Sequence, residues 1–196
     1  LSVIDKVITK TKINFKFIDL GGGMGISYSN KEKKLNLHQY ANIVNKFVKN
    51  KKTKIIFEPG RSIVGNTSIL ISRIIYIKKS NRKNFIILDA GMNDLMRPAL
   101  YDAYHKIIPL KKDKKKIFGK IEFVGPVCES SDKFLKQKSF SKIKEGDYIA
   151  ITDVGAYGMS LSSNYNTRPI ISEVMVNGSK HWLIKKKQSL ETLINN

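Results

Sequence analysis

Two short apolar segments that each run straight into a glycine turn constrain the fold of this chain most. Residues 15–20 lead into three consecutive glycines, and residues 54–58 lead into Pro59-Gly60. Between them, apolar side chains recur at helical spacing over residues 37–50. Short apolar strands separated by an amphipathic helix are typical of parallel βα units, whose ligand groups collect at the carboxyl ends of the strands. The first 60 residues therefore predict βα units with a binding edge.

The pattern changes near residue 66. Residues 67–78 form a long β-rich run, followed by a polar turn and the apolar run 85–89, which predicts a hairpin. Asn177-Gly178 predicts a second hairpin turn near the end of the chain. Further strands are expected at 117–124, 147–153, 170–176 and 181–185, with Ser189 capping a last helix at 190–194. The second region is therefore expected to be an antiparallel β domain.

The net charge of +20 invites a nucleic-acid partner. The lysines are spread through loops such as 111–116 and 185–187, without a stacking run of aromatic residues. We interpret the charge as compositional drift toward Lys, Ile and Asn, and expect no nucleic-acid partner. Five arginines stand out against this background, namely Arg61, Arg73, Arg82, Arg97 and Arg168.

No apolar run is long enough to span a bilayer, and the first residues do not have the pattern of a signal peptide. We expect no membrane association and a cytoplasmic protein. Leu1, Ile4 and Ile8 recur at helical spacing, which indicates a helix that belongs to a further βα unit. The three histidines show no metal-ligand spacing, so we expect no metal and no catalytic histidine among His38, His105 and His181.

The single cysteine lies in Phe123-Val124-Gly125-Pro126-Val127-Cys128-Glu129. One cysteine cannot form an internal disulfide, so it is either a small buried hydrophobe or a working thiol. It follows an apolar strand and a Gly-Pro turn, beside the carboxylate of Glu129. The segment alone leaves both roles open.

Five motifs in one order decide between such alternatives. They are Ile18-Asp19-Leu20-Gly21-Gly22-Gly23-Met24-Gly25, Phe57-Glu58-Pro59-Gly60-Arg61-Ser62, Leu88 to Tyr101, Cys128-Glu129 and Gly155-Ala156-Tyr157-Gly158. Together they resemble the C-terminal half of the diaminopimelate decarboxylases, pyridoxal-phosphate enzymes of the alanine-racemase-like fold. The resemblance implies an α/β plus all-β chain. Residues 1–65 would end a cofactor-binding (β/α)₈ barrel, and residues 66–196 would form an antiparallel β-barrel or sandwich domain with short active-site helices.

The resemblance also implies roles for individual residues. Each motif alone is also compatible with a purely structural role, such as a tight turn, a packed aromatic ring or a surface arginine. In the family, the cofactor is held by positions matching Gly21, Gly22, Gly23, Glu58, Gly60, Arg61 and Tyr157. The substrate is held by positions matching Arg61, Arg97, Tyr101, Glu129 and Tyr157. Cys128 is implied to be the proton donor.

The implied reaction is the pyridoxal-phosphate-dependent decarboxylation of meso-2,6-diaminopimelate to L-lysine and CO₂. The far end of this substrate carries an ammonium and a carboxylate, which call for an acid and an arginine. Glu129 and Arg97 match that need, whereas related ornithine decarboxylases carry Asp after the cysteine. Ornithine, arginine and carboxynorspermidine decarboxylases stay open as alternatives, as does a non-catalytic regulatory homologue.

Two further expectations follow from the resemblance. No lysine lies in the strand-end context that the family uses for its Schiff base, so residues 1–196 alone are expected to be inactive. In the family, the loop that matches Cys128-Glu129 reaches into the neighbouring subunit's site. The resemblance therefore implies a homodimer with shared active sites.

Overall fold

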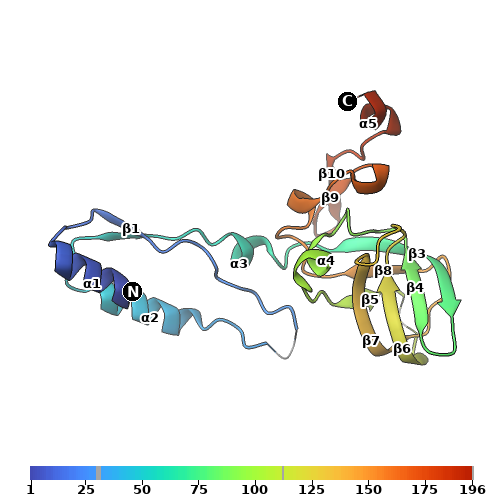
Figure 1. Ribbon diagram of the computed structural model, residues 1–196, viewed down its shortest axis with the longest axis horizontal. Coiled ribbons are helices and arrows are strands. Elements are labelled where there is room, and N and C mark those ends of the chain that lie inside the picture. Colours follow the sequence, from blue (N-terminus) through green and yellow to red (C-terminus); the bar gives the residue numbers. More distant parts are fainter. Residues whose placement is uncertain (30–31, 112, 196) are drawn as a thin grey trace. The chain divides into compact units, whose positions relative to one another are not determined.

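The computed structural model describes residues 1–29, 32–111 and 113–195, and the chain divides into two compact units (Figure 1). Unit 1 is Leu1–Gly65 and unit 2 is Asn66–Asn196. Unit 1 contains a two-stranded sheet, and unit 2 contains a six-stranded sheet and a separate hairpin.

Unit 1 has the predicted βα character. Its elements are α1 (Ser2–Thr11), β1 (Phe17–Asp19), α2 (Leu37–Val48), β2 (Lys54–Ile56) and α3 (Gly60–Val64). The two strands pair in parallel, with Ile18 opposite Ile55, and both are shorter than the sequence predicts. Helix α2 begins where the Asn36 side chain accepts a hydrogen bond from the Gln39 N–H at 3.0 Å. The helix buries Val44 and Phe47.

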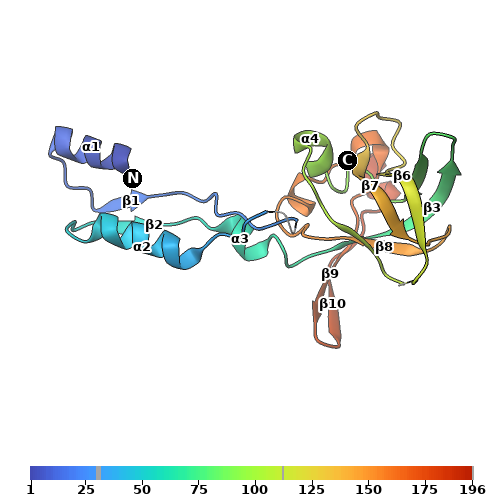
Figure 2. The same ribbon diagram turned by 90° about the horizontal axis from the view of Figure 1, so that it is seen from below.

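Unit 2 is mostly sheet, and the six strands form a nearly closed, barrel-like layer in the order β5-β8-β3-β4-β6-β7 (Figures 1 and 2). The strands are β3 (Leu70–Lys79), β4 (Asn84–Leu88), β5 (Ile107–Pro109), β6 (Lys116–Val124), β7 (Lys133–Ser141) and β8 (Tyr148–Ile151). The predicted hairpin is confirmed by the antiparallel pair β3–β4. Strand β3 also pairs with β8 through its first four residues, so it joins both halves of the sheet.

The expectation of a purely antiparallel domain is wrong at one pair, because β4 and β6 run parallel. The chain between them contains a short helix, α4 (Arg97–Tyr101), and β5, which lies at the far edge of the sheet. This long connection returns the chain to its starting end before β6 begins. The lysine-rich run 111–116, predicted as a loop, includes residue 112, which lies outside the described residues. Its last residue, Lys116, already begins β6.

Strand β7 is absent from the sequence prediction. Its residues, KFLKQKSFS, include no β-branched side chain and resemble the lysine-rich loops. It forms because it pairs with β6 along most of its length and buries Phe134 and Phe140. Tertiary pairing has overridden a weak local preference here.

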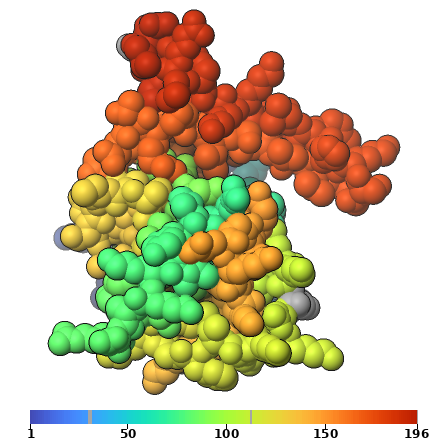
Figure 3. Space-filling model, turned by 90° about the vertical axis from the view of Figure 1, so that its right-hand side faces the viewer, coloured from blue at the N-terminus to red at the C-terminus, as the bar shows by residue number. Residues whose placement is uncertain are grey.

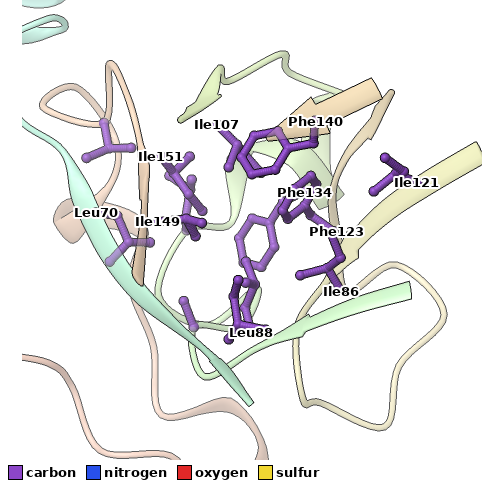
Figure 4. Close-up of a cluster of buried hydrophobic side chains, with 14 residues drawn as sticks. Leu70, Ile86, Leu88, Ile107, Ile121, Phe123, Phe134, Phe140, Ile149 and Ile151 are labelled. Carbon is purple, nitrogen blue, oxygen red and sulfur yellow. The ribbon is translucent and has the colours of Figure 1, made fainter. Parts of the chain in front are cut away.

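The core of unit 2 lies inside this curved sheet (Figure 4). Strand β3 alternates buried and exposed positions, with Leu70, Ser72 and Ile74 facing inward. Phe123 of β6 and Phe140 of β7 pack edge to face, with ring centroids 5.0 Å apart. The loops that carry the candidate site residues of unit 2 therefore extend from a sheet with a packed hydrophobic core.

The last part of unit 2 does not join the six-stranded sheet, and it stands out from the rest of that unit in orange and red in Figure 3. It begins with β9 (Glu173–Asn177) and β10 (Lys180–Lys185), which form the predicted hairpin around Gly178. Strand β9 starts three residues later than predicted. Helix α5 (Leu190–Asn195) follows, and Ser189 accepts the Thr192 N–H at 3.0 Å, which confirms the predicted cap.

Candidate functional site

In unit 1, the two glycine turns lie side by side where β1 and β2 end. The Glu58 N–H donates to the Gly21 carbonyl oxygen at 2.9 Å, so the contact between the strands continues into the turns. The Gly21 N–H donates to the Asp19 carboxylate at 2.7 Å, and the Gly60 N–H donates to the Glu58 carbonyl oxygen at 2.9 Å. The N–H groups of Gly21 and Gly60 are thus already hydrogen-bonded within the turns. These two glycines therefore contribute to a site through the shape of their backbone.

That shape depends on the lack of side chains. A Cβ atom on Gly22 would overlap the carbonyl oxygen of Glu58, so this position cannot hold another residue without a backbone shift. Gly21 and Gly23 have φ angles of +67° and +79°, and the space that a Cβ would occupy on either is open. The turns therefore form a bare backbone cradle that a compact anion such as a phosphate would fit. Arg61 lies half-buried in the first turn of α3, beside this cradle.

In unit 2, the loop 125–132 between β6 and β7 presents Cys128 to solvent. Within this chain Cys128 is therefore not buried, and its role as a working thiol stays a prediction. The Glu129 N–H donates to the Val127 carbonyl at 2.8 Å, and the Asp132 N–H donates to the Glu129 carbonyl at 3.1 Å, so the loop is tightly wound. The Glu129 carboxylate oxygens lie 3.4 Å from the Ser131 N–H and 3.4 Å from the Tyr165 hydroxyl.

Asp132 fastens this loop to another part of the site. One carboxylate oxygen accepts the Val127 N–H and the other accepts the Met92 N–H, both at 2.8 Å. A Cβ on Gly125 would overlap the same carboxylate, which explains the glycine before Pro126. Burial raises the pKa of Asp132, while the two backbone hydrogen bonds oppose that rise. Asp132 therefore joins the cysteine loop to the turn that contains Met92.

The turn 91–94 is a hub for further contacts. The side-chain oxygen of Asn93 accepts from Nε of Arg168 at 2.9 Å, and the carbonyl of Asn93 accepts the Ser163 N–H at 3.0 Å. The Asp94 carboxylate accepts the Gly91 N–H at 2.9 Å and lies 3.7 Å from Nη2 of Arg168. Burial raises the pKa of Asp94, against the effects of these partners. One turn thus connects the cysteine loop, the segment 163–168 and α4.

Arg97 and Tyr101 both lie in α4, as predicted, but their environments differ. The side chain of Tyr101 is 65% exposed, whereas Arg97 is only 7% exposed. Nη1 of Arg97 lies 3.0 Å from Nε2 of His105, which is fully buried. Pro98 and Ala99 of α4 share an open groove with Ser130 and Ser131 of the cysteine loop, so the helix and the loop are neighbours.

Tyr157 has a φ angle of +61°, which is unusual for an aromatic residue and costs about 1–2 kcal/mol. A Cβ on Gly158 would overlap the carbonyl oxygen of Val154, so the turn is tightly closed beneath the tyrosine. The ring is half-exposed. Such strain is a feature of functional sites, and here it directs an aromatic side chain away from a buried turn.

Sequence reasoning missed the residues that brace the loops, namely Asn93, Asp132 and His105. The sequence did give a signal for Arg168, because it is one of only five arginines in a lysine-rich chain. Its guanidinium donates from two different nitrogens, to the side chain of Asn93 and to the carbonyl oxygen of Asp89. Among the described residues, no group of His, Cys, Asp and Glu could hold a metal ion. Within that same part of the chain, no helix has the length and apolar character needed to cross a bilayer.

The chain combines glycine turns at strand ends in unit 1 with a cysteine loop braced by Asp132 on the curved sheet of unit 2. The chain belongs to the family of the pyridoxal-dependent decarboxylases, and the model of their C-terminal sheet domain matches residues 2–155.

Its relatives are more specific. The diaminopimelate decarboxylase of Aquifex aeolicus is 41% identical over 188 residues, which are 95% of this chain and 44% of the relative. The crystal structure of diaminopimelate decarboxylase from Helicobacter pylori complexed with L-lysine has a TM-score of 0.88 and 42% identity, covering 99% of this chain and 48% of that one. A lysine/ornithine decarboxylase from Vibrio vulnificus complexed with putrescine shares the fold, with a TM-score of 0.70 and 19% identity. The chain spans less than half the length of these proteins.

Proposed function

We propose that this chain acts as the C-terminal half of a pyridoxal-phosphate-dependent decarboxylase that converts meso-2,6-diaminopimelate to L-lysine and CO₂. Unit 1 would be the end of a (β/α)₈ barrel, and unit 2 the sheet domain. The observation that carries the proposal is the Asp132 carboxylate, which holds the Cys128-Glu129 loop against the turn that leads into Arg97. The decarboxylases at 40–44% identity support the choice of substrate.

The residues of unit 1 fit the cofactor. The open cradle over Gly21 and Gly23, together with Gly22, Gly60 and Arg61, would hold the phosphate group. Glu58 and Tyr157 are further residues that we propose for cofactor binding. When bound, pyridoxal phosphate supplies the electron sink for loss of CO₂. Residues 1–196 alone would be inactive, since they span only 44% of the relative from Aquifex aeolicus.

Cys128 would return a proton to the carbon that loses CO₂. A cysteine thiol is among the side chains that can act as a general acid in proton transfer. The exposed position of Cys128 at the tip of a braced loop leaves the sulfur accessible to a ligand. The carboxylate of Asp132 accepts the Val127 N–H of this loop, and this contact would limit the sulfur of Cys128 to a small range of positions.

The remaining residues would recognise the far end of the substrate. Glu129 would pair with its ammonium, while Arg97 and Arg61 would pair with its carboxylate, and Tyr101 would contact the same end. Ornithine has no far carboxylate, so this set favours diaminopimelate. The likeness to the lysine/ornithine decarboxylase shows the fold alone and does not favour that substrate.

A homodimer with shared sites is part of the proposal, with Cys128 and Glu129 completing the site of the neighbouring subunit. We also propose a cytoplasmic location, because an exposed, unpaired thiol suits a reducing compartment.

A chimera tests the function directly. Residues 1–196 replace the matching C-terminal segment of the decarboxylase from Aquifex aeolicus, and lysine and CO₂ are measured with meso-diaminopimelate as substrate. The chimera is expected to bind pyridoxal phosphate and to form lysine. Turnover of ornithine without turnover of diaminopimelate would overturn the substrate. Cofactor binding without any decarboxylation would favour the regulatory homologue.

A further inference from the structure

Arg97 and His105 form a buried pair that joins α4 to the strand β8 side of the sheet. Arg97 is 7% exposed and His105 is fully buried. Nη1 of Arg97 lies 3.0 Å from Nε2 of His105, and Nδ1 of His105 lies 2.9 Å from the carbonyl oxygen of Thr152, directly after β8. The arginine thus contacts a side chain that is itself anchored to the sheet.

The chemistry of the partners determines the protonation of His105. A guanidinium can only donate, so Nε2 of His105 must be the acceptor and carries no proton. A carbonyl oxygen can only accept, so Nδ1 carries the proton. The ring is therefore the neutral Nδ1–H tautomer. Burial lowers the pKa of His105, which agrees with this neutral form, although the hydrogen bond to Thr152 opposes the shift.

The hydrogen bond to Nε2 of His105 has a consequence for the geometry of Arg97. It restricts the direction of the guanidinium plane. A guanidinium recognises a carboxylate through N–H groups that lie in this plane, so the direction of the plane determines how well a carboxylate can pair with Arg97.

We propose that His105 is a positioning residue that orients Arg97 for the carboxylate at the far end of the substrate. The inference rests on the proposed function, and it deepens it by naming a determinant of substrate specificity that does not itself touch the substrate. His105 follows Arg97 by eight residues, so it belongs to the same segment of chain but reaches the arginine from the side of the sheet.

The binding of two ligands distinguishes a positioning role of His105 from a role in the stability of the site alone. L-Lysine keeps the far amino-acid group of diaminopimelate, including its carboxylate, whereas cadaverine has amines at both ends and no carboxylate. If His105 acts through Arg97, its loss weakens binding of lysine and leaves binding of cadaverine unchanged. A general distortion of the site would weaken both.

The experiment uses the chimera loaded with pyridoxal phosphate and measures inhibition constants for both ligands, with KM and kcat for diaminopimelate. His105→Phe keeps a ring but removes the acceptor and the donor. We expect roughly tenfold weaker binding of lysine and a similar rise in KM, with kcat and cadaverine inhibition changed less than about threefold. His105→Gln can accept from Arg97 and donate to Thr152, and should recover most of the loss. His181→Phe, at an exposed histidine of β10, is the matched control and should change nothing.

Each outcome of this experiment supports or contradicts the role of His105. Equal weakening of lysine and cadaverine, or of neither, would overturn the role of His105. If His105→Phe does not bind the cofactor, His105→Asn, which is too short to reach both partners, replaces it and should show the same selectivity. If Arg97→Met leaves lysine binding unchanged while the chimera still decarboxylates diaminopimelate, Arg97 is not the carboxylate partner and the inference fails. If the unmodified chimera never forms lysine, the proposed function fails instead.

Discussion

The two candidate regions are built in opposite ways. In unit 1, the glycine turns after β1 and β2 shape a site with backbone, and Gly22 allows the chain to approach Glu58 closely. In unit 2, the cysteine loop takes its shape from a buried side chain, the Asp132 carboxylate, which accepts two backbone N–H groups from different turns. A backbone cradle is therefore sensitive to added atoms, while a braced loop is sensitive to lost hydrogen bonds.

The largest effect is expected from the tip of the braced loop. Cys128→Ala in the chimera should lower kcat about 10²- to 10⁴-fold, because the positioned proton donor is lost, while cofactor binding persists. Activity and the absorbance of bound cofactor are measured together.

Mixing sharpens this test. Subunits of Cys128→Ala are exchanged with subunits that lack the Schiff-base lysine of the N-terminal half. If the loop completes the neighbour's site, one site of each heterodimer is intact and about a quarter of the activity returns. If activity stays absent after verified exchange, the site is not shared.

Glu129, the neighbour of the cysteine, should control substrate affinity rather than the loop. Glu129→Asp is expected to raise KM for diaminopimelate about tenfold or more, since a hydrogen bond to a charged group is worth about 1.5–3 kcal/mol. Steady-state kinetics provide the measurement. Unchanged KM and kcat would mean that Glu129 does not touch the substrate.

The backbone cradle can be broken by one methyl group. Gly22→Ala places a Cβ against the Glu58 carbonyl, and overpacking of this kind costs about 1–3 kcal/mol. We expect roughly tenfold weaker binding of pyridoxal phosphate, measured by cofactor titration. Gly25→Ala, where the structure has open space, is the control and should bind normally. Equal affinities in the two variants would show that the turn does not hold the cofactor.

The braced loop should respond to a change that adds no bulk. Asp132→Asn exchanges one accepting oxygen for an amide donor, which leaves either the Met92 or the Val127 N–H without its partner. A buried donor without a partner costs about 1–3 kcal/mol in the free energy of unfolding, measured by urea denaturation. The exposed Glu191→Gln serves as the control. No loss of stability would mean that the loop is held by other contacts.

The smallest effect concerns pH. Burial lowers the pKa of His105, so the folded protein binds its proton less tightly than the unfolded chain does. Its contribution to stability is present above the ordinary pKa of about 6.5 and is lost as the pH falls toward the lowered value. Asp94 and Asp132, whose pKa values are raised by burial, contribute with the opposite sign above about 3.8. We expect the unfolding free energy of the parent to fall more steeply below pH 6.5 than that of His105→Gln, and parallel curves would contradict this.

The positions of the glycine turns, of the hairpin at Gly178 and of α2 could be predicted because each depends on neighbours in sequence. A glycine marks a turn through its φ angle, and an amphipathic helix shows its period within a few turns. The same local signals located the motif residues, including Cys128, Glu129, Arg97 and Tyr157, although their roles stay predictions.

The features that could not be predicted depend on residues that are distant in sequence. The sequence of β7 has little preference for a strand, and it became one because β6 lies beside it. Asp132 and Met92 are 40 residues apart, and Thr152 is 47 residues from His105, so no local pattern could pair them. Hydrogen bonds of this kind form only after the sheet has brought the loops together. The order of residues alone shows which chemical groups are present and where the chain turns, whereas the fold determines which of those groups hold one another in place.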